Sequence, residues 1–250
     1  MTAPNVDLAL VVDTSQSMKN CFDQLRQHLG ALLTPMQGNV SKVRYSLVGL
    51  SASKSSEGGV TYLVNFLHGP WDFKLYERSP NDPDPRNEYF TDNADDLKQA
   101  LARLDPSGDE DMLLALDIAA DLPFVPVSNT KRVIALFSDE SFERGVSGNE
   151  GNAMIPSLRE KLMARHIQLF AAVPEGKGAN DLAETDRSEV EFIDGGGGLK
   201  SVDFSRLLAQ MGKSISGSSL QSVSEPPYQR ALFGQDKWAQ GTGWSSTDGG

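Results

Sequence analysis

Residues 7–17 read DLALVVDTSQS, and in this stretch a short apolar run gives way at Asp13 to a polar turn. An uninterrupted apolar run of this kind is typical of a strand buried on both faces of a parallel sheet. Residues 19–37 then place apolar side chains at intervals of three and four, which indicates an amphipathic helix. A buried strand followed by an amphipathic helix is the first half of a βαβ unit, so this stretch predicts a parallel α/β sheet.

Outward from this stretch, strand patterns alternate with helical patterns along the chain. The other predicted strands are residues 43–51, 61–67, 132–137, 167–173 and 189–193. The other predicted helices are residues 94–104, 112–122, 155–164 and 179–186, and a last one that starts at Asp203, a residue type suited to the N-cap. This alternation predicts a doubly wound, mostly parallel sheet with helices on both faces.

The segments between these elements differ in composition. Residues 54–59 are rich in glycine and serine and indicate a hairpin connection, whereas residues 68–93 are rich in proline and aspartate and indicate an irregular loop. Helical periodicity ends after Ser216. We therefore predict one domain over residues 1–216 and a Ser/Gly-rich C-terminal tail over residues 217–250. The tail carries isolated bulky residues that could dock on the domain itself or on a partner, namely Tyr228, Leu232, Phe233, Trp238 and Trp244.

Composition and charge narrow the function. The chain has 250 residues and a formal net charge of −11, which argues against a nucleic-acid partner because phosphate binding needs a basic surface. No apolar run reaches the roughly 18 residues that a membrane span needs. The N-terminus has no secretion signal, and the single cysteine, Cys21, excludes an intrachain disulfide, so we expect a cytoplasmic protein. Cys21 lies in an apolar helical pattern, so we expect its side chain to be buried. The three histidines lie far apart, which argues against a zinc site.

Oxygen-bearing side chains follow two of the predicted buried strands. Asp13, Ser15 and Ser17 occupy alternate positions directly after the first strand, and Asp139 follows the strand at residues 132–137. Because ligands bind at the carboxyl edge of doubly wound sheets, these side chains are placed where a ligand is expected. Two strand-end carboxylates on neighbouring strands would repel each other unless a cation neutralised them, and oxygen donors suit a hard cation such as Mg²⁺. The alternative is that each acid caps the helix that follows it.

The order of these features resembles the von Willebrand factor A (vWA) domain with its metal-ion-dependent adhesion site. The resemblance covers residues 5–216 and rests on the buried strand that ends in DxSxS and the later strand that ends in Ser-Asp. It implies a six-stranded sheet of order 3-2-1-4-5-6 with an antiparallel edge strand at residues 61–67. It further implies that Mg²⁺, or Mn²⁺ or Ca²⁺, is held by Asp13, Ser15, Ser17 and Asp139.

One part of the sequence departs from the family pattern. The family supplies a threonine ligand before its third helix, whereas residues 93–129 contain no threonine. An acid stands in the matching stretch, and we expect Asp109, with Glu110 or Asp111 as alternatives, to take that place. A third carboxylate would give the loaded site a net charge of −1, which should strengthen metal binding and weaken attraction to an anionic partner. The same loop could instead simply cap the next helix.

The resemblance implies a non-enzymatic protein–protein interaction module. Intracellular members act as adaptors for AAA+ ATPases or as scaffolds in larger assemblies, and such a protein is the partner we expect. One alternative is a vWA-like scaffold with an inactive metal site that binds through its loops and tail. Another is a Mg²⁺-dependent aspartate-based phosphatase, but the second aspartate of such an enzyme is replaced here by Ser15. Residues 212–214 (GKS) are no phosphate-binding loop, because Leu207 occupies the position where that motif needs glycine.

Overall fold

A computed structural model of the chain describes residues 3–36, 38–51, 60–63, 89–104, 112–126, 129–142, 148–194 and 202–217. Its centre is a sheet in which five strands run parallel, as the alternating sequence pattern predicts. These strands are β1 (Asn5–Asp13), β2 (Lys42–Ser51), β4 (Thr130–Phe137), β5 (Ile167–Pro174) and β6 (Ser188–Ile193). β1 and β4 are buried along almost their whole length because both faces of the sheet are covered.

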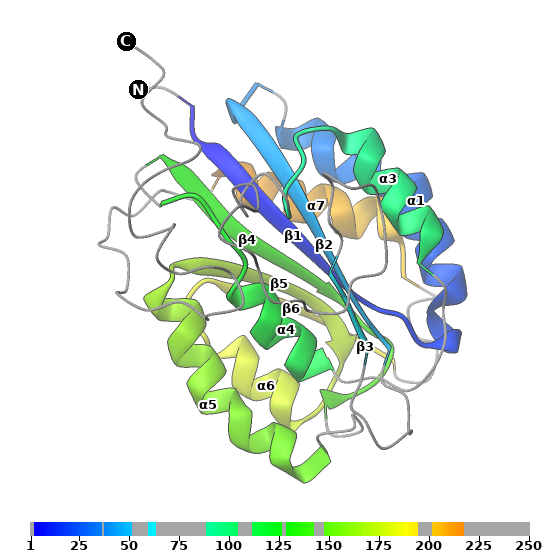
Figure 1. Cartoon of the computed structure of the whole chain (residues 1–250), viewed down its shortest axis with the longest axis vertical. Coiled ribbons are helices and arrows are strands. Elements are labelled where there is room, and N and C mark those ends of the chain that lie inside the picture. Colours follow the sequence, from blue (N-terminus) through cyan, green and yellow to red (C-terminus); the bar gives the residue numbers. More distant parts are fainter. Residues whose placement is uncertain are drawn as a thin grey trace, which may run out of the picture.

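The strand order is β3-β2-β1-β4-β5-β6 (Figure 1). A short strand, β3 (Val60–Leu63), pairs antiparallel with β2 at one side of the sheet. β1 therefore lies between β2 and β4. The strands β2 and β3 extend the sheet on one side of β1, and the strands β4, β5 and β6 extend it on the other. Val12 of β1 pairs with Phe137 of β4, so the two strands reach the carboxyl edge at the same level. This is the switch point at which open α/β sheets bind ligands.

Helices cover both faces of the sheet and enclose two apolar cores (Figure 1). On one face lie α1 (Lys19–Leu33), α3 (Ala94–Arg103) and α7 (Phe204–Gly217), with the short 3₁₀ turns η1 (Gln16–Met18) and η2 (Thr34–Met36) at the two ends of α1. On the other face lie α4 (Met112–Ala120), α5 (Gly148–Ala164) and α6 (Lys177–Ala183). The predicted α/β class, with helices on both faces, is confirmed.

Helix bounds follow the sequence pattern where the apolar stripe is clear. The backbone N–H of Arg206 donates to Asp203 Oδ1 at 3.0 Å, so Asp203 caps α7 as predicted. The predicted helix over residues 19–37 instead ends at Leu33, and Thr34–Met36 continue as a 3₁₀ turn. α5 begins at Gly148, earlier than the predicted Ile155, because its first turns lack an apolar stripe that the sequence could show. Most of the predicted loop at residues 68–93, all of the hairpin connection at 54–59 and all but Gly217 of the tail lie outside the described residues.

The amino edge of the sheet holds a network of buried ions that the sequence patterns did not indicate. Arg44 of β2 donates to both carboxylate oxygens of Asp7 on β1, at 2.8 and 2.6 Å, and the backbone N–H of Val125 donates to the same carboxylate at 2.8 Å. Arg132 of β4 donates to the carbonyl oxygens of Val125 and Arg165, at 2.9 and 3.0 Å. These contacts tie the loop after α4 to three strands at the edge opposite the predicted metal site.

Candidate metal centre

The DxSxS segment forms a tight polar turn at the carboxyl end of β1. Asp13 is the last residue of the strand, and the backbone N–H of Ser15 donates to its Oδ1 at 2.7 Å. Ser15 is extended, with φ −64° and ψ 161°, and its carbonyl accepts the Met18 N–H at 3.1 Å to start η1. The aspartate side chain thus folds the backbone into a turn that brings Ser15 and Ser17 to the same side.

The carboxyl end of β4 brings its own polar residues beside this turn. Because Val12 pairs with Phe137, the next residue of β4, Ser138, comes level with Asp13. Ser138 Oγ donates to Asp13 Oδ2 at 2.8 Å. Asp139 follows at the rim of the sheet, where its Oδ1 accepts a hydrogen bond of 2.8 Å from Ser17 Oγ. The expected neighbourhood of the two strand-end aspartates therefore forms.

Hydrogen bonds join the four predicted ligands into one cluster of oxygens. Ser17 Oγ lies 2.8 Å from Ser15 Oγ as well as 2.8 Å from Asp139 Oδ1. Asp13 joins them through the Ser15 backbone and through Ser138. The structure thus brings Asp13, Ser15, Ser17 and Asp139 together, although they are up to 126 positions apart in the sequence, between residues 13 and 139.

The cluster combines concentrated negative charge with burial. Asp13, Ser15 and Asp139 are 0%, 2% and 1% exposed, whereas Ser17 faces solvent, so the cluster is reached from the Ser17 side. Among the described residues, no lysine or arginine forms an ion pair with Asp139. A buried carboxylate costs several kcal/mol unless a cation compensates it. Two carboxylates with two hydroxyls are a donor set that fits a hard divalent cation.

The negative charges of Asp13 and Asp139 also act on the thiol of Cys21 in α1. It is 3% exposed, which confirms the predicted burial. Burial raises the pKa of its thiol, and the charges of Asp139 and Asp13 raise this pKa further. The thiol therefore stays protonated at neutral pH and is a poor nucleophile.

The fifth predicted ligand cannot be placed. Asp109 lies outside the described residues, and so do its alternatives Glu110 and Asp111; the structure resumes at Met112, the first residue of α4. Within the described ranges, no group of three or more His, Cys, Asp or Glu side chains gathers to hold a metal. Among the described residues the cluster consists of two carboxylates and hydroxyls, and a third carboxylate from Asp109 stays a prediction.

Ser138 is a member of the cluster that the predicted ligand set omits. It is fully buried, and besides bonding to Asp13 its Oγ accepts the Glu140 N–H at 3.1 Å. It thereby fixes the Asp13 carboxylate and the turn that carries Asp139. The sequence held a signal for it, because Ser138 lies between the end of a buried strand and the predicted ligand Asp139.

Comparisons with known proteins identify the class of fold. No protein-family model matches the chain, and no curated protein matches its sequence. The structure is similar to the VWA domain of SpRpn10, with a TM-score of 0.52 and 12% identity over 84% of this chain and 98% of that one. The chain thus has the α/β fold of vWA domains.

A second similar structure is proximal thread matrix protein 1 from the mussel byssus. Its two crystal forms match with TM-scores of 0.52 and 0.53 and identities of 14% and 12%, over 86% of this chain. The matches cover 47% and 49% of the mussel protein, so this chain corresponds to about half of it. At these identities the likeness concerns the fold alone. Among the described residues, no helix is long and apolar enough to cross a bilayer.

Proposed function

We propose that this protein is a divalent-metal-dependent protein–protein interaction module. The observation that carries the proposal is the hydrogen-bonded cluster of Asp13, Ser15, Ser17 and Asp139 at the carboxyl edge of the sheet. These side chains would hold Mg²⁺, Mn²⁺ or Ca²⁺, and the metal would supply a Lewis-acidic position for an oxygen ligand of a partner protein. Exposed Ser17 marks the side from which that partner approaches.

The kind of partner is inferred from the family resemblance. A component of a larger assembly, such as an AAA+ ATPase, fits the adaptor role that the resemblance implies. We also propose a cytoplasmic location, since a single free cysteine suits a reducing compartment. If Asp109 also contributes, the loaded site carries a net negative charge, and a neutral oxygen ligand is then favoured over a carboxylate.

The proposed module performs no catalysis. An aspartate-based phosphatase needs a second acid two residues after the nucleophile, and Ser15 occupies that position with its hydroxyl next to Ser17. Asp13 has both carboxylate oxygens in hydrogen bonds, to the Ser15 N–H and to Ser138 Oγ, and is fully buried. These contacts orient the carboxylate as a fixed ligand rather than as an attacking group.

The first prediction concerns metal binding to the native state. We expect the melting temperature of the wild-type chain to rise when Mg²⁺, Mn²⁺ or Ca²⁺ replaces EDTA, because a ligand that binds only the folded state stabilises it by about 2.7 kcal/mol at 100 times its Kd. The double variant Asp13→Asn/Asp139→Asn keeps the shape of both side chains and should lose the metal response. Differential scanning calorimetry with each metal measures both effects.

A matched control separates metal binding from general charge. Asp95 and Asp186 are exposed acids outside the cluster. The variant Asp95→Asn/Asp186→Asn therefore removes an equal number of negative charges and should leave the metal response intact. A wild-type chain that melts at the same temperature in EDTA and in millimolar metal would refute the metal site. The vWA-like scaffold that binds through loops and tail would then be the better description.

A further inference from the structure

The strand β6 lies at the free side of the sheet. It is the last strand in the order β3-β2-β1-β4-β5-β6, so among the described residues its outer edge has no partner strand. It also carries Phe192, whose side chain is 42% exposed, one of two large apolar residues in the described chain that are this open. Unpaired strand edges with exposed apolar side chains are sites at which another strand adds.

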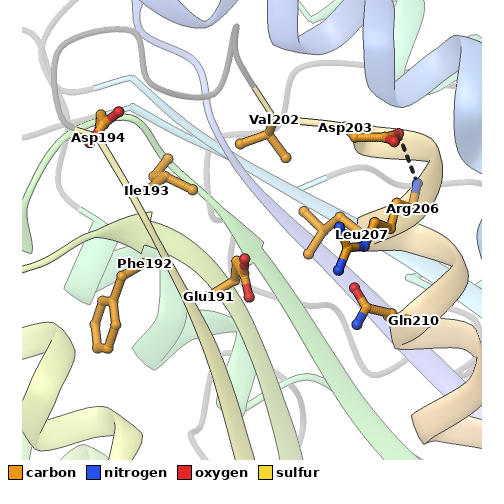
Figure 2. A pocket seen from close by; sticks show the side chains of 9 residues that line it. All are labelled: Glu191, Phe192, Ile193, Asp194, Val202, Asp203, Arg206, Leu207 and Gln210. Carbon is orange, nitrogen blue, oxygen red and sulfur yellow. Dashed lines mark hydrogen bonds between the residues drawn. The ribbon is translucent and has the colours of Figure 1, made fainter.

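A cavity of about 360 Å³ lies beside this edge, between β6 and the first turns of α7. Figure 2 shows that Glu191 and Ile193 point toward α7, whereas Phe192 points away from it. Leu207 and Gln210 of α7 form the opposite wall. The volume is in the range of cavities that take up a large side chain or a small ligand.

The cavity is acidic. Its lining contains the carboxylates of Glu191, Asp194 and Asp203 and one guanidinium, that of Arg206. The neighbouring Glu189 carboxylate accepts hydrogen bonds from Ser214 Oγ at 2.8 and 2.9 Å. In contrast, Glu191 has no ion-pair partner among the described residues. A pocket with acidic groups beside the apolar side chains of Ile193, Val202 and Leu207 favours an occupant that combines an aromatic or aliphatic side chain with a cation.

The chain itself carries such a segment shortly after α7 in the sequence. α7 ends at Gly217, and Lys131 Nζ fixes this end by donating to the carbonyl oxygens of Ile215 and Ser216, at 2.7 and 3.2 Å. Lys131 is near the start of β4, so α7 ends at the amino edge of the sheet. Residues 228–233 of the tail read YQRALF and follow two prolines.

We propose that residues 228–233 of the C-terminal tail bind the edge of β6 as an antiparallel strand. Side chains alternate across a strand, so Tyr228, Arg230 and Leu232 share one face. With that face toward α7 and Arg230 opposite Glu191, the antiparallel register places Tyr228 opposite Ile193, where it enters the cavity, and Leu232 opposite Glu189. The other face then places Gln229 opposite Phe192 and Ala231 opposite Val190. This inference is independent of the metal site.

The antiparallel direction follows from the handedness of the fold. β5, α6 and β6 form a parallel crossover unit with α6 on one face of the sheet, whereas α7 lies on the opposite face. Such units are right-handed in nearly all proteins. A parallel strand beyond β6 would therefore need a left-handed crossover through α7, which folded proteins avoid. An antiparallel strand requires that residues 218–227 first run back to the carboxyl edge. That linker spans up to ~33 Å when extended, against ~20 Å for the length of β6.

Disulfide trapping in the full chain tests the proposal. The variant Phe192→Cys/Gln229→Cys places two thiols directly across the expected strand pair, and native Cys21 does not compete because it is buried and its pKa is raised. The control Met163→Cys/Gln229→Cys uses a residue of matching exposure, 41%, at the end of α5. We expect the first pair to close within one chain roughly tenfold faster in a glutathione buffer, as judged by mass spectrometry of the linked peptides.

Three outcomes would overturn the proposal. Equal closure rates for the two pairs would mean that the tail has no preferred site. Linkage between two chains, seen as a disulfide dimer, would mean that a second copy occupies the edge. The third concerns charge: Glu191→Arg and Arg230→Glu should each slow closure, and the double reversal should restore it. Closure rates that are unchanged in all three charge variants would contradict the placement of Arg230 beside Glu191.

Discussion

Replacing Arg44 with methionine is expected to lower the free energy of unfolding by about 3–5 kcal/mol, the cost of leaving a buried charge without its partner. Arg44 and Asp7 are 3% and 2% exposed at their side chains and share two hydrogen bonds. The Arg44 guanidinium also lies 4.6 Å from the ring centroid of Phe90, a cation–π contact that methionine would replace only in part. Urea unfolding of the two chains measures the difference.

Two further variants show whether the buried charge is the cause. The double variant Asp7→Asn/Arg44→Met removes both charges, so it should be more stable than Arg44→Met alone. Arg26→Met breaks an ion pair with Asp23 that is largely exposed to solvent, and this variant should change the stability by less than about 0.5 kcal/mol. If Arg44→Met lowered the free energy of unfolding as little as Arg26→Met, the buried pair would contribute little to stability.

This buried pair also illustrates what sequence patterns miss. Asp7 opens the DLALVV run and looks like a polar residue that precedes a buried strand, yet it is 1% exposed. Its burial depends on Arg44 of β2 and on the Val125 N–H, which lie 37 and 118 residues away. Periodicity reports which faces of an element are apolar, but it cannot report a polar contact between elements that are distant in the sequence.

The parallel sheet was predictable because its signal is local. Continuous apolar runs of β1, β4 and β5 mark strands that are covered on both faces, and each run is long enough to be recognised by itself. β6 is different, because it alternates partly buried and exposed residues and ends with two apolar residues, of which Phe192 is exposed. Its edge position follows from the order of the strands and not from its own sequence.

The candidate metal centre was predictable for a different reason. Asp13 and Asp139 each follow a recognisable strand, and parallel neighbours bring their carboxyl ends to one edge. The sequence therefore indicated which side chains meet, although it could not show that Ser138 would orient Asp13 or that Ser17 would bridge to Asp139. Those contacts depend on rotamers that only the packed turn determines.

Replacing Gly212 with alanine is expected to lower the free energy of unfolding by about 2–3 kcal/mol, as for other insertions into a packed core. Gly212 lies in α7 where this helix crosses the end of α1. A Cβ atom there would be 2.3 Å from the Leu32 carbonyl oxygen, and the Leu32 carbonyl carbon and Pro35 Cγ would lie at 3.2 and 3.3 Å. Because the nearest atom belongs to the backbone, the helices themselves must separate to admit the methyl group.

Gly30→Ala is the matched control, and it should raise the free energy of unfolding where Gly212→Ala lowers it. Gly30 lies in α1 with no atom within 4 Å of a Cβ placed there, so the change should stabilise the helix by up to about 1 kcal/mol through its higher helix propensity. Calorimetry of both variants compares them directly. A Gly212→Ala chain as stable as Gly30→Ala would contradict the close crossing of α1 and α7. The expected pair of results would instead explain the glycine of the GKS sequence at residues 212–214, because Gly212 is then required by the packing of α7 against α1.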